Sequence, residues 1–167
     1  FTTIKNIANR KKIKTITIGS NSGTIKILQH KYQQNKQIVK VYANSKIISL
    51  HIPLIGYFQV KNLLMAILAA SCCGININKA FKVINNIRPV SGRLECIANL
   101  KNNAKIILDF AHTPEALKQS LIALKDQFRR NIILVFGCGG ERDKKKRSIM
   151  GTIAAKYCRK IFVTDDN

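Results

Sequence analysis

A carboxylate and an imidazole stand three positions apart in the segment Asp109-Phe-Ala-His-Thr-Pro-Glu-Ala-Leu117. An apolar run ends at the start of this segment, and a predicted helix begins within it. The free N–H groups at a helix N-terminus suit a phosphate or a nucleotide ribose. Asp109 and His112 are therefore candidate nucleotide ligands. A plainer interpretation, in which Asp109 caps locally and His112 packs, remains open.

A glycine-rich segment, Phe136-Gly-Cys-Gly-Gly-Glu-Arg-Asp-Lys144, follows another apolar run. Its glycines allow either a sharp turn or the close approach of a ligand to the backbone. It has neither the Gly-Lys-Ser/Thr of a P-loop nor the spaced third glycine of the dinucleotide fingerprint, so alone it indicates a strand-to-helix turn. The mixed charges of residues 141–147 form either a solvated face or a clamp for an anion or a carboxylate.

Three more positions are candidates. Arg93 follows Gly92 at a possible hinge, where a guanidinium could reach phosphates. The segment 164–167, Thr-Asp-Asp-Asn, closes a third strand with polar groups able to hold a zwitterion. Asn62 begins a predicted helix, where its amide is either a cap or a ligand contact, and capping is the interpretation that this residue alone favours. The sequence shows no serine or cysteine in an arrangement typical of a nucleophile, so no catalytic residue is assigned. His30 and His51 receive no role.

The elements that must position these residues fall into two groups. Alternating runs at 14–18, 24–29, 37–42 and 46–52, separated by polar turns, predict a small antiparallel meander. A helix that is apolar nearly all round follows at 60–73, closed by Gly74, and a second helix at 78–86.

After the Pro- and Gly-punctuated segment 87–92 the pattern changes to β-α-β-α-β. Strands are expected at 105–110, 131–136 and 160–164, with helices starting at Thr113-Pro114 and at Ser148. Strands this apolar, separated by helices, predict a parallel sheet covered on both faces. The chain is thus an α/β protein with domains 1–91 and 92–167, and the carboxyl ends of its parallel strands are where ligands are expected.

The composition narrows the classes of partner. The net charge of +21 would suit nucleic acid, but the basic residues are scattered among Ile and Asn, as in proteins from A/T-rich genomes, so no nucleic acid partner is expected. The longest apolar run is too short to span a bilayer, so no membrane insertion is expected. Five cysteines without zinc-ligand spacing indicate buried, reduced thiols in a cytosolic protein and no metal site. A start at Phe1 and a stop just after a strand indicate a fragment of a longer protein.

Taken together, these segments resemble the Mur ligases. The resemblance covers residues 14–167 and is carried, in order, by residues 54–63, 90–95, 109–117, 136–144 and 164–167. Within the family, the match is closest to ligases that add the third amino acid to UDP-N-acetylmuramoyl-L-alanyl-D-glutamate. The sequence departs from the family at Tyr57 and Gln59, where Arg and Asn are usual, and at Lys145 and Ser148, where Gly and Pro are usual.

The resemblance implies a cytoplasmic, ATP- and Mg²⁺-dependent ligase of peptidoglycan precursor synthesis. Residues 1–91 would be the C-terminal part of the central ATP-binding domain, a small antiparallel sheet plus helices, and residues 92–167 the first half of a Rossmann-like C-terminal domain. The implied substrates are a UDP-N-acetylmuramoyl dipeptide and a diamino acid, either meso-diaminopimelate, which is favoured, or lysine, and the sequence does not decide between the two. Because the family's P-loop, Mg²⁺ ligands and modified lysine lie outside the chain, the chain alone is expected to be inactive.

The resemblance also assigns residues. It implies a nucleotide-binding set consisting of Asn62 at the adenine and Arg93, Asp109 and His112 at the ribose and phosphates. It implies an amino-acid-binding set consisting of Arg142, Asp166, Asn167 and, in the same loop, Lys144. Three alternatives remain open. The first is a ligase like folylpolyglutamate synthetase, which shares the Asp-x-Ala-His segment. The second is a non-catalytic basic nucleic-acid-binding fragment, and the third is a degraded, non-functional remnant, which the substitutions at Tyr57 and Gln59 favour. The oligomeric state is not readable from the sequence.

Overall fold

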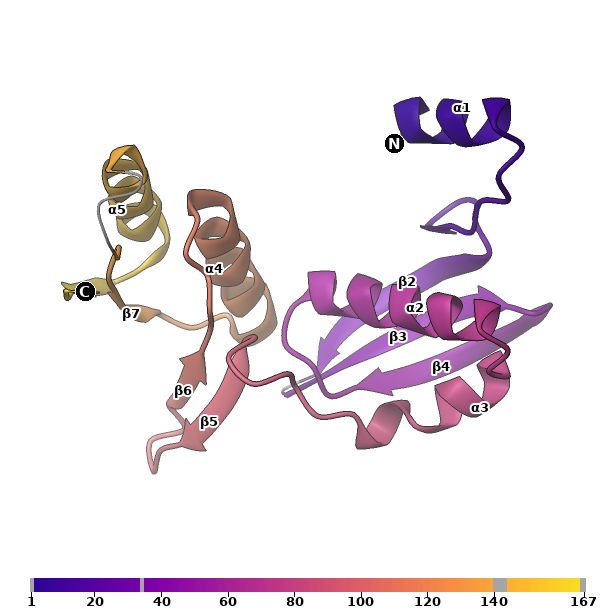
Figure 1. Ribbon diagram of the computed structural model, residues 1–167. Coiled ribbons are helices and arrows are strands. Elements are labelled where there is room, and N and C mark those ends of the chain that lie inside the picture. Colours follow the sequence, from indigo (N-terminus) through magenta and orange to yellow (C-terminus); the bar gives the residue numbers. More distant parts are fainter. Residues whose placement is uncertain (1, 34, 140–143, 166–167) are drawn as a thin grey trace.

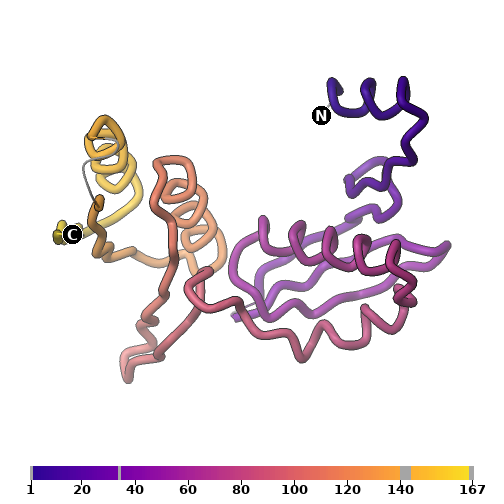
Figure 2. Tube along the Cα trace, in the orientation of Figure 1, coloured from indigo at the N-terminus to yellow at the C-terminus, as the bar shows by residue number. Residues whose placement is uncertain are grey.

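A four-stranded sheet crossed by a long helix forms the first half of the fold (Figure 1). The computed structural model describes residues 2–33, 35–139 and 144–165. The elements of this half are β1 (Ile18–Gly19), β2 (Ile25–Gln33), β3 (Lys36–Ala43), β4 (Lys46–Ile52), α2 (Tyr57–Cys72), α3 (Ile77–Lys82) and the 3₁₀ turn η1 (Ile84–Asn86). An additional helix, α1 (Thr2–Arg10), was not predicted and stands away from this sheet in Figure 2.

The predicted meander is confirmed for β2, β3 and β4, which pair in antiparallel order. Asn44 and Ser45 make the tight turn between β3 and β4, with φ of 49° and 61°, the left-handed conformation that two-residue hairpins of this kind need. The expected strand at 14–18 is wrong. Only Ile18 of that run lies in a strand, and β1 pairs with β2 in parallel.

Helix α2 begins at Tyr57, with Gly56 as its N-cap at φ 89°. Its buried residues, Val60, Leu64, Ile67 and Leu68, all face the sheet core. Although the sequence makes this helix apolar nearly all round, one side of it is not buried, since Met65 is 56% exposed. The predicted terminator Gly74 is confirmed: it follows the C-cap with φ 91°, a conformation that glycine adopts without strain.

The second half contains β5 (Glu95–Asn99), β6 (Lys105–Leu108), α4 (Pro114–Phe128), β7 (Ile133–Phe136), α5 (Lys145–Tyr157) and β8 (Lys160–Val163). Helix α4 begins as predicted. The Thr113 hydroxyl accepts a hydrogen bond from the Ala116 N–H at 3.3 Å, and Pro114 occupies the first turn. Leu117 and Leu121 of α4 pack against Met150 of α5 to form the core of this half.

The predicted parallel sheet is confirmed for one pair of strands and wrong in two other respects. Strands β7 and β8 pair in parallel, but β6 pairs antiparallel with β5, a strand that was not predicted. Ile133, Val135 and Val163 are 65%, 66% and 77% exposed, so helices cover one face of the β7–β8 pair and not both. Within the described ranges no helix has the length and apolar character to cross a bilayer.

The prediction of buried cysteines is also wrong. All five thiols are free, and Cys72, Cys73 and Cys96 are exposed while Cys138 and Cys158 are half-buried. Cys72 and Cys73 lie at the end of α2, beyond the part that packs on the sheet, and Cys96 lies on β5. Burial raises the pKa of the Cys158 thiol, since the thiolate is the poorly solvated form.

A buried series of hydrogen bonds joins the two halves. The Gln127 side chain in α4 accepts from the Gly56 N–H at 2.9 Å. The amide nitrogen of Gln37 in β3 donates to the carbonyls of Leu54 (2.7 Å) and Gly56 (3.0 Å). Since this fixes the orientation of the Gln37 amide, its oxygen accepts, and the His30 Nε2 at 2.7 Å donates. The first half of the molecule therefore holds the carbonyl of Gly56, and the second half holds its N–H.

Candidate functional site

A cavity of about 820 Å³ opens where α2, the segment 87–93 and the start of α4 meet. Small-molecule sites in proteins measure roughly 300–1,000 Å³, so the size suits a ligand such as a nucleotide. Its walls are formed by Leu54, Phe58, Gln59, Asn62, Leu63, Ala66, Ile87, Arg88, Val90, Arg93, Asp109, Phe110, Ala111, His112, Ala116, Gln119 and Ser120. Both halves of the fold contribute to this wall.

All four residues of the predicted nucleotide set, Asn62, Arg93, Asp109 and His112, line this cavity. They come from three separate segments. Asn62 lies in the second turn of α2, since that helix starts at Tyr57, so the capping interpretation of Asn62 is wrong. Its exposed amide is instead part of the cavity wall. The fold thus brings together residues that the sequence could only list.

Two hydrogen bonds hold the half-buried carboxylate of Asp109. The Leu94 N–H donates to Oδ1 at 3.1 Å, and the Ser120 hydroxyl donates to Oδ2 at 2.5 Å. An ionised carboxylate offers about four lone-pair positions, so each oxygen of Asp109 can accept one further hydrogen bond. Asp109 is therefore a fixed acceptor at the cavity wall.

An aromatic ring and two basic side chains lie beside Asp109. Phe110 is 62% exposed, the Arg93 guanidinium carbon lies 4.9 Å from its ring centroid, and the His112 ring packs edge-on at 5.1 Å. His112 Nδ1 lies 3.1 Å from the Phe110 carbonyl oxygen. Because a carbonyl only accepts, Nδ1 carries the proton in this contact. With the N-terminus of α4 next to it, this wall attracts negative charge.

The loop that carries Arg93 is fixed by its own backbone. Gly92 and Leu94 on either side of Arg93 have φ of 67° and 47°, and the Gly92 N–H donates to Glu95 Oε2 at 2.9 Å. The Gly92 carbonyl accepts from the Phe110 N–H at 2.8 Å. These contacts tie the Arg93 turn to the strand end that bears Asp109.

The predicted amino-acid-binding residues are not in this cavity. Lys144 is exposed and stands at the N-cap of α5, outside the wall. Arg142, Asp166 and Asn167 lie outside the described residues. The first turn of α5 does reach the site, because Lys146 Nζ donates to the His112 carbonyl at 3.3 Å.

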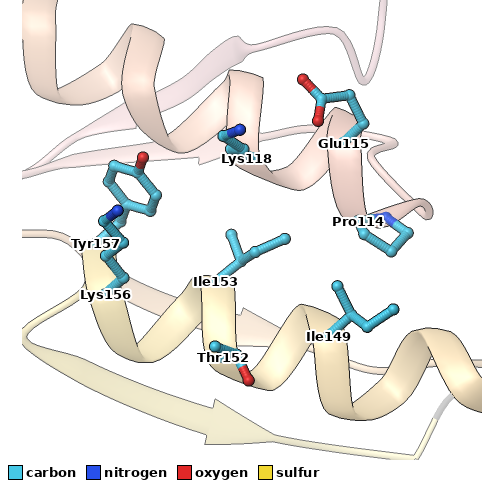
Figure 3. A pocket seen from close by; sticks show the side chains of 8 residues that line it. All are labelled: Pro114, Glu115, Lys118, Ile149, Thr152, Ile153, Lys156 and Tyr157. Atoms are coloured by element: carbon cyan, nitrogen blue, oxygen red, sulfur yellow. The ribbon is translucent and has the colours of Figure 1, made fainter.

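A smaller hollow of about 330 Å³ lies between α4 and α5, and none of the predicted site residues lines it. Figure 3 shows Ile149 and Ile153 of α5 pointing toward α4, with Lys118 on the opposite wall. The hollow is less than half the size of the cavity beside Asp109 and has fewer residues in its wall, so it offers fewer ligand contacts.

Sequence reasoning missed Ser120 and Phe110. The available signal for Ser120 was its position between Leu117 and Leu121, a polar residue inside the buried stripe of α4. Among the described residues, no three His, Cys, Asp or Glu side chains come together in a way that would hold a metal ion.

The fold is that of an α/β protein of two joined units with a cavity lined by both of them. Comparison with known proteins identifies its family. The model of the Mur ligase middle domain matches residues 1–70, and that of the Mur ligase glutamate ligase domain matches residues 92–167. The chain belongs to the Mur ligase family. The α/β fold class expected from the sequence is confirmed.

Among curated relatives, the UDP-N-acetylmuramoyl-L-alanyl-D-glutamate–2,6-diaminopimelate ligase of Rhizobium meliloti is 38% identical over 151 residues, which are 90% of this chain and 31% of that protein. The ligase of the same name from Rickettsia felis is 37% identical over 98% of this chain and 30% of its own length. The chain thus spans about a third of these relatives. A solved structure of a ligase with this name superposes with a TM-score of 0.66 at 29% identity, covering 98% of this chain and 34% of that one.

Proposed function

We propose that the cavity binds the adenine nucleotide of an ATP-dependent ligase. The observation that carries the proposal is the convergence of Asn62, Arg93, Asp109 and His112 on one wall. In this proposal Asn62 contacts the adenine, Asp109 accepts from ribose hydroxyls, and Arg93 and His112 face the phosphates. A carboxylate acceptor, a planar guanidinium and a helix N-terminus are the groups that bind these parts of a nucleotide.

We further propose that the protein takes part in joining 2,6-diaminopimelate to UDP-N-acetylmuramoyl-L-alanyl-D-glutamate, the reaction for which its relatives are named. A substrate carboxylate oxygen would attack the γ-phosphorus and displace ADP, and the amine would then attack the acyl phosphate carbon and displace phosphate. Arg142, Lys144, Asp166 and Asn167 are proposed to hold the amino acid. We propose that residues 1–91 and 92–167 belong to two domains. Mg²⁺ is proposed as a cofactor bound by groups other than those described, and the cytoplasm is proposed as the location.

The folylpolyglutamate synthetase alternative has less support. The Lactobacillus casei enzyme superposes with a TM-score of 0.72 and 97% coverage of this chain, but at 16% identity, which establishes a shared fold alone. The relatives named for diaminopimelate reach 38% identity. The sequence similarity therefore favours the peptidoglycan precursor as substrate.

The direct test measures nucleotide binding by the 167-residue chain. ADP is titrated into ¹⁵N-labelled protein, and NMR spectra monitor the binding. We expect the signals of residues 58–62, 93–94 and 109–112 to shift together. Arg93→Ala should weaken binding by about tenfold or more, because a hydrogen bond to a charged group contributes roughly 1.5–3 kcal/mol and 1.4 kcal/mol corresponds to tenfold.

Arg130→Ala is the matched control, since Arg130 is also exposed but lies outside the cavity wall. It removes the same charge and should leave the affinity unchanged. Equal weakening by the two variants would mean that ADP is attracted by the overall charge of +21 and not by a site. An absence of shifts around Asp109 would contradict the proposal.

A further inference from the structure

Ser120 makes an unusual hydrogen bond for a hydroxyl in a helix. The comparable hydroxyls bond to carbonyls of their own helix: Ser71 to Leu68 at 2.7 Å in α2, and Thr152 to Ser148 at 3.0 Å in α5. Such local bonds are the usual alternative for helical Ser and Thr. Ser120 instead donates to the Asp109 carboxylate, 11 positions earlier in the sequence.

The environment of Ser120 makes this contact strong. The residue is 7% exposed, so its hydroxyl must bond within the protein. The hydroxyl donates to a carboxylate, and hydrogen bonds to an ionised acceptor are about twice as strong as neutral ones. Asp109 thus depends on Ser120 as one of its two protein donors.

The two donors reach different oxygens of one carboxylate. Leu94 N–H binds Oδ1 and Ser120 binds Oδ2. Together they fix the rotation of the carboxylate about its last side-chain bond, which one donor alone would leave free. The remaining lone pairs are then held in one direction, which favours a ligand that presents two neighbouring hydroxyls.

We propose that Ser120 is a positioning residue that orients Asp109 for recognition of the ribose hydroxyls. This inference rests on the proposed nucleotide site and adds to it the residue that sets its preference for ribose. Ser120 does not contact the nucleotide in this arrangement, and its effect passes through Asp109.

The test compares the affinity of the chain for ADP with its affinity for 2′,3′-dideoxy-ADP. Wild type should favour ADP by about tenfold, the size expected for hydrogen bonds to a charged acceptor. Ser120→Ala should reduce this ratio to about threefold or less, with the affinity for the dideoxy nucleotide changed less than about twofold. Ser120→Thr, which keeps a hydroxyl, should retain most of the preference.

Ser71→Ala is the control, because it removes a half-buried helical hydroxyl that lies outside the cavity wall. Its ratio should equal that of wild type. If Ser120→Ala weakens both nucleotides equally, or neither, the positioning role is overturned.

A ligand-free measurement separates this inference from the proposed function. The Leu94 amide and the Asp109 carboxyl carbon should shift in NMR spectra of Ser120→Ala but not of Ser71→Ala. If wild type binds no nucleotide, the proposed function fails whatever these spectra show. If wild type binds ADP while Ser120→Ala leaves both signals and the ratio unchanged, the inference about Ser120 fails alone.

Discussion

Replacing Gln127 with Leu should lower the free energy of unfolding by about 2 kcal/mol. Leu has a similar volume, so the change removes the acceptor of the Gly56 N–H without opening a large void. Both residues are buried, and a buried donor left without a partner costs roughly 1–3 kcal/mol. In a chain of this size, about 2 kcal/mol corresponds to roughly 4–8 °C in Tm.

Urea unfolding followed by far-UV circular dichroism is the suitable assay, because the chain has no tryptophan to report by fluorescence. The matched control is Gln119→Leu. Gln119 lies on the same helix but is exposed, and its amide bonds to Glu115 at 2.7 Å one turn away. A pair of this kind contributes about 0.2–0.5 kcal/mol. If the two variants lose equal stability, the buried contact to Gly56 does not contribute as argued.

The buried hydrogen bonds around Gly56 allow a sharper test by a double-mutant cycle. Gln37 donates to the Gly56 carbonyl and Gln127 accepts from the Gly56 N–H, so their replacements by Leu should not be additive. A coupling free energy of about 0.5 kcal/mol or more is expected for residues that share a partner. Strict additivity would show that the two halves hold Gly56 independently.

Two further variants probe single features. Gly56→Ala should cost more stability than Gly74→Ala in the same unfolding assay. Both glycines have positive φ, but a Cβ at Gly56 would lie 2.9 Å from the Ala123 Cβ, whereas a Cβ at Gly74 would meet no atom within 4 Å. Equal losses of stability would refute the clash at Gly56. Burial, and secondarily the charge of Asp126, raises the pKa of Tyr32 above 10.0, so the unfolded chain loses this proton first and stability should fall as the pH rises through 10 and beyond. Tyr32→Phe should flatten that fall, and an unchanged pH profile would contradict the cause given.

Local chemistry explains which elements could be predicted. The start of α4 depends on Thr113 and Pro114, which act within one turn, and the structure shows the predicted cap. The hairpin at Asn44 and Ser45 is likewise a property of adjacent residues. Strand β5 carries no such signal, since its alternation is weak and its pairing with β6 includes an irregular register.

The site shows the same division. Asp109 and His112 were candidates because of their position between a strand and a helix. The structure places them in the wall of one cavity with Asn62, and their roles stay proposals. The partners of Ser120 and Gln127 could not be predicted. Each is a polar residue on the buried face of a helix, which the sequence shows, but its partner lies 11 or 71 positions away. The neighbouring residues in the sequence contain no information about partners so far away.

The cavity is walled by both halves of the fold, and this has a thermodynamic consequence. A ligand that contacts residues of both halves stabilises their docked arrangement, adding RT ln(1 + [L]/Kd) to the free energy that keeps the halves together. Such a ligand binds only molecules whose halves are docked, so its apparent Kd rises in inverse proportion to the fraction of molecules that is docked. Gln127 lies outside the wall yet bonds the two halves. A change at Gln127 that lowers the docked fraction would therefore weaken a bound ligand without altering any ligand contact.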